Sequence, residues 1–379
     1  MPKDHEAGKA PELTHYVTDS GYAEQQETRV YVGRNDPAPQ SLLLLDLASH
    51  RSWPLASDML PGIKDDPLKD LRAKAIAALQ KAGKDDQAKA LKAPAVRAVR
   101  IISSADDGGG GGIVWSDDGR NLAIQLRAID NKDRWIASVD FDKHVLVNQQ
   151  RLTDPAWINW SFNDFGWLND GRTLWYLSEQ SGYSRLYAKS LDGAARQLTG
   201  AGKFEVSAPQ LSADGKWFYL LANKVAPYSY DVYRVPSSGG ELTRLTQYQG
   251  TDAFELSPDG TQLAVLHSAP YMFDQLAVQN AAGGTPKELT NTMKSAYTSR
   301  HWIAPKIVEV PSSHGAGVIY AKYYGPASEA DAPASRPAVI FVHGAGYLQD
   351  VSLQETYYFR EQMFHNLLVQ QGYVVLDMD

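Results

Sequence analysis

Short apolar runs bounded by turn residues dominate the first 300 residues of this chain. Four Asp-Gly pairs recur 44 to 52 residues apart, and each of the four is followed at once by an apolar, aromatic-rich stretch. Asp-Gly between two β-like runs indicates a hairpin, and we expect type I′ turns, which need positive φ at both central residues. The turns are Asp118-Gly119, Asp170-Gly171, Asp214-Gly215 and Asp259-Gly260, and the strands predicted after them are 121–126, 173–177, 217–221 and 262–266.

A second repeated pair keeps the same period. Leu-Thr occurs at 152–153, 198–199, 245–246 and 289–290, with spacings of 44 to 47 residues, and a further strand recurs between the two markers at 184–187 and 230–233. Hairpin units of about 40–50 residues are typical of propeller blades. The chain is therefore predicted to be mostly β, a β-propeller of four-stranded blades. Four blades are clear, and residues 41–55 predict a fifth.

The pattern changes after residue 305. An apolar strand at 339–342, a periodic stretch at about 355–370 and a second apolar strand at 372–378 predict a strand, a crossover helix and a parallel strand. The first strand runs into His343-Gly344-Ala345-Gly346-Tyr347. A buried strand that enters a His-Gly-x-Gly turn is the oxyanion-loop signature of an α/β-hydrolase. Two parallel strands cannot cover both of their faces. We therefore expect residues 306–379 to be a truncated N-terminal part of an α/β-hydrolase domain, and 1–305 to be the propeller.

The nucleophile of such a domain is missing. In an α/β-hydrolase the Gly-x-Ser-x-Gly elbow, the acid and the catalytic His all follow the oxyanion loop. No Gly-x-Ser-x-Gly occurs in the 379 residues. We expect the catalytic Ser, Asp and His to lie outside this chain, and the fragment alone to be inactive.

A helical insertion is predicted at residues 64–97. Asp66 before Pro67 indicates an N-cap with proline at the first helical position, and Gly83 ends the run. A second short helix is expected from Asp86 to Lys92. The insertion either covers an edge of the sheet or shields a substrate entrance.

Composition narrows the classes of function. The net charge of −7 argues against a nucleic-acid partner, which needs clustered Lys and Arg. The absence of cysteine excludes disulfides, structural Cys zinc sites and Cys nucleophiles. No apolar run reaches the roughly 18 residues of a membrane span. No metal or cofactor is expected, since His267, His301, His314 and His365 show no metal-ligand spacing. The compartment is left open.

The order of a propeller followed by an α/β-hydrolase matches the prolyl oligopeptidase family of serine peptidases, and this chain resembles its dipeptidyl-peptidase-like branch. The likeness extends over most of the chain and is most specific at 154–160, 165–171 and 178–187, where Trp157, Trp160 and Trp167 are followed by a Gly-Tyr turn and a Leu-Tyr strand. The stretch 307–325 and the His-Gly-Ala-Gly turn fit the start of the hydrolase domain.

The resemblance implies hydrolysis of short peptides through acyl transfer to a serine. It assigns residues 343–347 to stabilisation of the tetrahedral oxyanion, which is worth roughly 3–4 kcal/mol per donor. In relatives the residue just after this strand is often a Tyr whose hydroxyl helps. Here His343 holds that position and Tyr347 follows the turn, so either could be the donor. Family members can dimerise, and the oligomeric state is left open.

The substrate class stays open at this point. Dipeptidyl peptidases of this family carry adjacent glutamates that hold the free amine of the substrate, but this chain has no Glu-Glu pair. Asp106 and Asp107 lie near the corresponding place and are the candidate substrate-binding residues. Both dipeptidyl and oligopeptidase or acylaminoacyl-peptidase-like specificity remain. Two other classes compete: a stand-alone propeller that binds a protein or peptide, and an esterase with a propeller domain.

Overall fold

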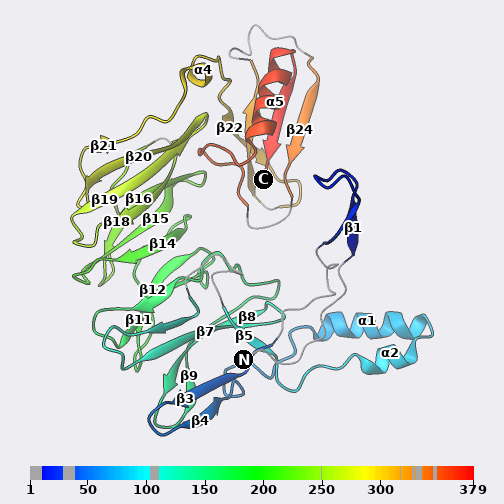
Figure 1. Ribbon diagram of the computed structural model, residues 1–379, viewed down its shortest axis with the longest axis vertical. Helices are drawn as coiled ribbons and strands as arrows, with labels where there is room; N and C mark the ends of the chain where they lie inside the picture. Colours follow the sequence, from blue (N-terminus) through cyan, green and yellow to red (C-terminus); the bar gives the residue numbers. More distant parts are fainter. Residues whose placement is uncertain are drawn as a thin grey trace. The chain divides into compact units, whose positions relative to one another are not determined.

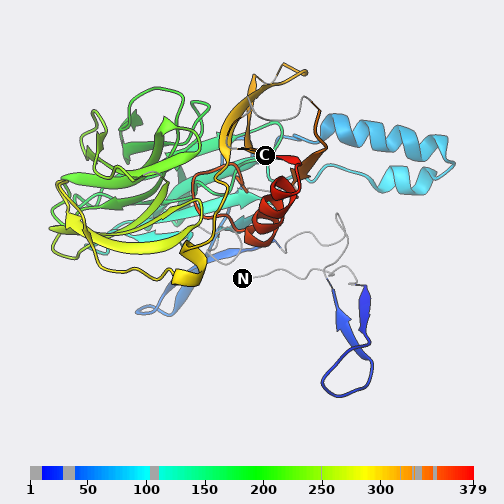
Figure 2. The same cartoon turned by 90° about the horizontal axis from the view of Figure 1, so that it is seen from above.

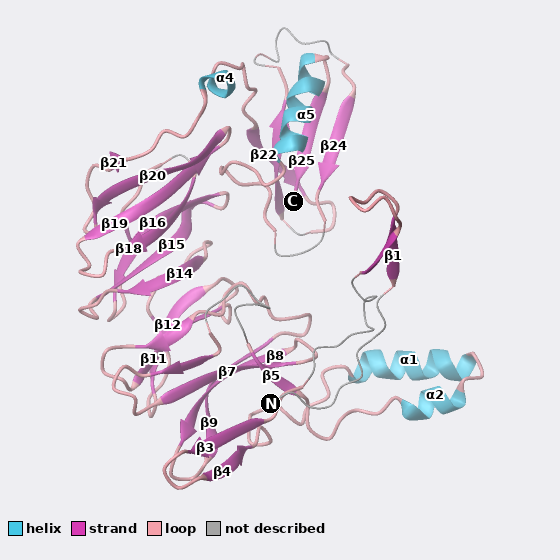
Figure 3. Cartoon of the chain, in the orientation of Figure 1, coloured by secondary structure: helices cyan, strands magenta, loops and turns pink. Residues whose placement is uncertain are grey.

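The computed structural model describes residues 11–28, 39–102, 111–248, 250–315, 317–326, 328, 335–344 and 348–379 (Figure 1). The chain divides into two compact units: residues 1–160 together with 170–174, and residues 161–169 together with 175–379. The described residues are mostly β, as Figure 3 shows. The helices among them are α1 (Lys69–Lys81), α2 (Asp85–Ala90), α4 (Ser295–Thr298) and α5 (Phe359–Gln370).

The first unit contains two hairpins and one larger sheet. The hairpins pair β1 (Glu12–His15) with β2 (Glu24–Glu27) and β3 (Leu42–Asp46) with β4 (Arg51–Leu55). The larger sheet, called the β7 blade, has the order β5-β7-β8-β9, and β6 pairs with β7 beside β5. Its strands are β5 (Val99–Ile101), β6 (Ile113–Trp115), β7 (Leu122–Ala128), β8 (Asp133–Asp140) and β9 (Val145–Thr153). The fifth blade predicted at 41–55 is only a two-stranded hairpin among the described residues.

Three further sheets follow along the chain. The β11 blade comprises β10 (Phe165–Trp167), β11 (Thr173–Ser178), β12 (Arg185–Ser190) and β13 (Arg196–Gln197). The β15 blade comprises β14 (Val206–Leu211), β15 (Trp217–Ala226), β16 (Ser229–Pro236) and β17 (Thr243–Arg244), and the β19 blade comprises β18 (Thr251–Leu256), β19 (Gln262–Ala269), β20 (Met272–Asn280) and β21 (Lys287–Glu288). Each is a four-stranded antiparallel meander, as predicted. A parallel contact between Tyr230 and Thr251 joins the last two.

The Asp-Gly pairs lie at the predicted turns, but the predicted type I′ geometry is wrong. Positive φ occurs at the glycines, for example 68° at Gly119 and 70° at Gly215, and not at the aspartates. The N–H of Gly215 donates to the carbonyl of Ser212, and the Ser212 hydroxyl donates to Asp214 at 2.7 Å. This is a type I turn followed by one left-handed residue. Ser116 and Ser257 make the same contacts in their turns. The hydrogen bond between the serine and aspartate side chains stabilises the type I turn, so these turns do not need type I′ geometry.

Three of the Leu-Thr pairs form hydrogen bonds to the third strand of their blade. In the β15 blade the N–H of Leu245 donates to the carbonyl of Val232, and the Thr246 hydroxyl oxygen accepts the N–H of Val232 at 2.8 Å. Leu198-Thr199 binds Leu186 in the same way, and Leu289-Thr290 binds Leu276. The repeat therefore closes each of these blades where its short fourth strand ends.

The predicted helical insertion is present as α1 and α2, which lie side by side (Figures 1 and 2). The prediction of its start was wrong by about two residues: α1 begins at Lys69 with Leu68 as N-cap. Asp66 instead accepts the N–H of Leu68 at 3.2 Å and an ion pair from Arg72 at 2.9 Å. The helix ends before Gly83, whose φ is 67°.

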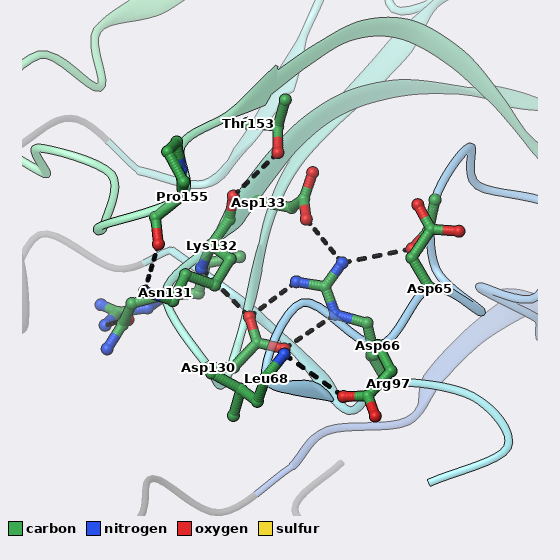
Figure 4. Close-up of polar contacts among 12 residues, drawn as sticks. Asp65, Asp66, Leu68, Arg97, Asp130, Asn131, Lys132, Asp133, Thr153 and Pro155 are labelled. Carbon is green, nitrogen blue, oxygen red and sulfur yellow. Dashed lines mark hydrogen bonds and ion pairs between the residues drawn. The ribbon is translucent and has the colours of Figure 1, made fainter. Parts of the chain in front are cut away.

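The base of this insertion is tied to the β7 blade by a buried charge cluster, called the Arg97 cluster (Figure 4). The Arg97 guanidinium, 4 % exposed, donates to both oxygens of Asp130 and to Asp133. It also donates to the carbonyl of Gly62 at 3.2 Å. Arg151 completes the cluster with a 2.6 Å contact to Asp133. Buried charges that are each paired in this way are tolerated in a protein interior.

The C-terminal part of the second unit is a four-stranded sheet with the order β22-β23-β25-β24. The predicted strand, helix and parallel strand are present as β24 (Ala338–Val342), α5 and β25 (Val374–Met378). The sheet is larger than the two strands predicted, because β22 (Lys306–Pro311) and β23 (Val318–Tyr324) join it in antiparallel fashion. α5 lies against one face (Figures 1 and 3), where its His365 packs on Phe341 and Tyr324.

Candidate functional site

The ends of β24 and β25 bring two predicted features together. The strands run parallel with Val342 opposite Met378, so the residues that follow them, His343 and Asp379, lie at one edge of the sheet. His343 Nε2 lies 3.2 Å from Asp379 Oδ1. The carboxyl ends of parallel strands are where ligands bind in open α/β sheets. The structure therefore places the His343 end of the predicted oxyanion loop at the edge where such a site is expected.

The side chain of His343 is directed at oxygens of its own chain. Its Nδ1 lies 2.7 Å from the carbonyl of Gly344, and its Nε2 faces Asp379. Only 9 % of the side chain is exposed. Both partners are acceptors, so in this arrangement the ring points no N–H toward a substrate. The predicted donor role of His343 stays a prediction, as does that of Gly344. Ala345, Gly346 and Tyr347 lie outside the described residues.

The far flank of this segment is held by Asp379. The N–H groups of Asp350 and Val351 donate to Asp379 Oδ1 at 2.7 and 3.0 Å. The same carboxylate oxygen thus contacts His343 before residues 345–347 and the chain after them. A carboxylate that accepts backbone N–H groups makes charge-assisted bonds, which are stronger than neutral ones. No sequence motif marks this role of Asp379.

The β15 blade supplies a second set of contacts to the same flank. The Tyr230 hydroxyl lies 2.7 Å from Glu205 Oε1 and 3.0 Å from Gln349 Oε1, and Gln349 Nε2 donates to the carbonyl of Pro227 at 3.0 Å. Burial, reinforced by the charge of Glu205, raises the pKa of Tyr230 above its usual range. The hydroxyl therefore stays protonated and can donate to these oxygens.

Glu205 is an acidic group that the search for paired glutamates missed. It is partly buried beside Tyr230, and its backbone N–H donates to Asn223 Oδ1 at 2.7 Å. It is a single glutamate, so the expected Glu-Glu signal could not reveal it. The candidate substrate-binding residues Asp106 and Asp107 lie outside the described residues, and their role stays a prediction.

Behind the flank lies a second buried charge cluster, called the Lys322 cluster. Lys322 on β23 lies opposite Asp377 on β25, and its Nζ is 3.5 Å from Asp350 Oδ1. All three residues are at most 4 % exposed. Burial and the neighbouring charge of Asp350 raise the pKa of Asp377 to about 8. Asp377 is therefore protonated at neutral pH.

One hollow of the second unit lies away from these residues. A depression of about 580 Å³ is lined by the β19 blade and residues 354–357, and includes Asp252, Phe273 and Glu355. Of the predicted site residues that the structure describes, neither His343 nor Gly344 lines it. In the described part of the chain no three His, Cys, Asp or Glu side chains are arranged to hold a metal ion. No helix there is long and apolar enough to cross a bilayer.

Comparison with known proteins agrees with the resemblance seen in the motifs. Residues 97–272 match the family model of the dipeptidyl peptidase IV N-terminal region. Among solved structures, dipeptidyl peptidase 4 from Porphyromonas gingivalis matches 98 % of this chain with a TM-score of 0.68 at 15 % identity. A protein from Bacteroides ovatus, named as a dipeptidyl aminopeptidase IV, matches 98 % of the chain with a TM-score of 0.68 at 13 % identity.

This chain spans 46 % and 48 % of the lengths of those two chains, which is about half. The structural likeness supports the mostly β, propeller-like fold. The family match covers all of the β7, β11 and β15 blades, and in the β19 blade it covers β18, β19 and the first residue of β20. The predicted resemblance to the dipeptidyl-peptidase-like branch is confirmed: residues 97–272 are similar to the dipeptidyl peptidase IV N-terminal region.

Proposed function

We propose that this chain is the propeller and oxyanion-loop part of a serine peptidase that hydrolyses short peptides. The observation that carries the proposal is the edge formed by β24 and β25. A strand followed by His343-Gly344 and a parallel strand followed by Asp379 come after a dipeptidyl peptidase IV-type region. This order is the one in which an α/β-hydrolase domain would begin, with residues 306–379 as its first part and residues 1–305 as the propeller.

In this proposal the chemistry is acyl transfer to a serine that a longer chain supplies. The serine attacks the peptide carbonyl, a histidine takes its proton, and the loop after β24 stabilises the oxyanion. Residues 1–379 contain no Gly-x-Ser-x-Gly elbow, so the isolated chain lacks a nucleophile placed next to a base. Peptides would reach the site along the blades, where Glu205 offers a carboxylate for a free amine.

The test compares the 379-residue chain with a longer protein that continues into the elbow. Both are treated with a fluorophosphonate probe and with dipeptidyl chromogenic substrates, either with a free amine or acetylated. We expect labelling and hydrolysis only in the longer protein. Stoichiometric labelling of a serine within residues 1–379 would contradict the assignment of the nucleophile. Peptide binding by the longer protein without hydrolysis would favour a binding module, and hydrolysis of simple esters alone would favour an esterase.

A further inference from the structure

We propose that Asp379 is a positioning residue that fastens both flanks of residues 345–347 to the end of β25. This inference rests on the proposed function, in which those residues belong to the oxyanion loop. The structure describes the flanks themselves: His343 and Gly344 before the segment, and Leu348 to Val351 after it. Asp379 contacts residues of both flanks, and nothing in the sequence pattern assigns it a role.

Three contacts converge on one atom. Asp379 Oδ1 accepts the N–H of Asp350 at 2.7 Å and the N–H of Val351 at 3.0 Å, and it lies 3.2 Å from His343 Nε2. The first two come from the chain that leaves the segment, and the third from the residue that enters it. One carboxylate therefore spans both ends. Backbone N–H groups away from bulk water need an acceptor, and this oxygen provides it for two consecutive residues.

The sheet explains why the acceptor lies in this place. β24 and β25 are adjacent and parallel, and Phe341 lies opposite Asp377, so the first residue after β25 falls beside the first residue after β24. The chain that leaves β24 at His343 returns over the end of β25 at Asp350 and Val351. A side chain one residue beyond β25 can reach both crossings only if it is short and accepts hydrogen bonds, and aspartate meets both conditions.

The neighbouring contacts restrain the returning chain but do not bridge the two flanks. Gln349 is held by Pro227 and Tyr230 of the β15 blade, and Asp350 Oδ1 accepts the Thr356 hydroxyl at 2.8 Å. All of these act on the second flank alone. Among the described residues, Asp379 is the side chain that contacts both flanks, and its loss should let them separate.

The first experiment measures backbone hydrogen exchange in the 379-residue chain at Asp350 and Val351. Asp379→Ala should raise exchange at both amides by about tenfold or more, because their acceptor is gone. Asp379→Asn keeps an acceptor oxygen and should restore most of the protection. Asp274→Ala, which removes an exposed carboxyl on β20, is the matched control and should leave these amides unchanged. Unchanged exchange in Asp379→Ala would overturn the proposal.

The second experiment uses the longer protein and separates positioning from simple packing. Asp379→Ala should lower kcat by about tenfold or more with KM within about twofold, since a displaced oxyanion donor acts in the transition state. Asp379→Asn should recover most of kcat. Faster exchange with unchanged kcat would overturn the positioning role. If the wild-type longer protein hydrolyses no peptide, the proposed function fails, while the exchange result still decides whether Asp379 holds the flanks.

Discussion

The two buried charge clusters of this protein pair their charged groups in different ways. In the Arg97 cluster the Arg97 guanidinium contacts the carboxylates of Asp130 and Asp133 at 2.5 to 2.7 Å. In the Lys322 cluster one ammonium faces two carboxyl groups, and its shortest contact is 3.5 Å. Among the described residues, no hydrogen-bond donor contacts Asp350 Oδ2 or Asp377 Oδ1.

The difference shows what each cluster can do. Arginine offers several hydrogen-bond donors in a fixed fork. The guanidinium of Arg151 contacts Asp133, so the Arg97 cluster has two guanidinium groups for two carboxylates. The Lys322 cluster has one more carboxyl group than it has cations. Burial and the charge of Asp350 raise the pKa of Asp377, which therefore keeps its proton at neutral pH. The first cluster is therefore an anchor for the helical insertion. The second contains a buried carboxyl group, that of Asp377, which titrates beside the candidate site.

Removal of Arg97 should have the largest effect. Arg97→Ala removes the guanidinium that Asp130 binds and leaves Asp133 with Arg151 alone, and breaking a buried pair in this way typically costs about 3–5 kcal/mol. Urea unfolding followed by tryptophan fluorescence measures the loss, since the Trp135 ring lies 5.7 Å from the Arg97 guanidinium. Arg120→Ala, at a mostly exposed position, is the control and should change little. A loss below about 1 kcal/mol for Arg97→Ala would remove the distinction between the two clusters.

Titration of Asp377 should give the next largest effect. Its folded pKa is raised from 3.8 to about 8, so the stability that the protonated form contributes is fully present below pH 4 and is lost as the pH rises through about 8. The wild-type chain should therefore lose about 4 kcal/mol relative to Asp377→Asn between pH 5 and 9, at about 1.4 kcal/mol per pH unit up to pH 8.

Asp377→Asn suits this test because asparagine imitates the protonated acid and does not titrate. Urea unfolding at a series of pH values gives the difference in free energy of unfolding. Asp274→Asn serves as the control, since that carboxyl is exposed. A difference between wild type and Asp377→Asn that stays constant with pH would show that Asp377 is ionised in the folded state.

A substitution at Gly62 should show the smallest effect of the three. A Cβ at Gly62 would lie 2.0 Å from the Arg151 guanidinium, and the φ of 74° is itself unfavourable for alanine. Gly83 has a φ of 67° and nothing within 4 Å. Both alanine variants share the backbone strain of about 1–2 kcal/mol, so we expect Gly62→Ala to cost about 1 kcal/mol more, for displacing Arg151 from Asp133. Equal losses would show that Arg151 moves without cost.

Repetition and spacing predicted most of the fold. The Asp-Gly and Leu-Thr markers located the blades because each recurs where a blade needs a tight turn or a clamp on its third strand. The turn type was wrong because the Ser-x-Asp-Gly side chains supply hydrogen bonds that a two-residue pattern does not include. The start of α1 was wrong because Asp66 bonds both Leu68 and Arg72 instead of capping the first helical turn.

The same reasoning predicted only part of the candidate site. The His-Gly turn was found from its local pattern, and the structure places His343 at the expected edge of the sheet. Asp379, Glu205 and Tyr230 were missed, since each contacts residues that are distant in sequence: Asp379 lies 36 residues from His343, and Tyr230 lies 119 from Gln349. A single sequence carries no signal for such pairs.

By itself, the sequence determined the spacing of four blades, the helical pair and the strand–helix–strand order at the end, because these depend on local hydrophobic period and turn chemistry. The tertiary structure decided which charges share a buried site. Lys322, Asp350 and Asp377 are unremarkable polar residues in the sequence, and only the pairing of β23 with β25 and the return of the chain over β25 enclose them. Burial removes their solvation, so their protonation depends on the neighbours that folding supplies.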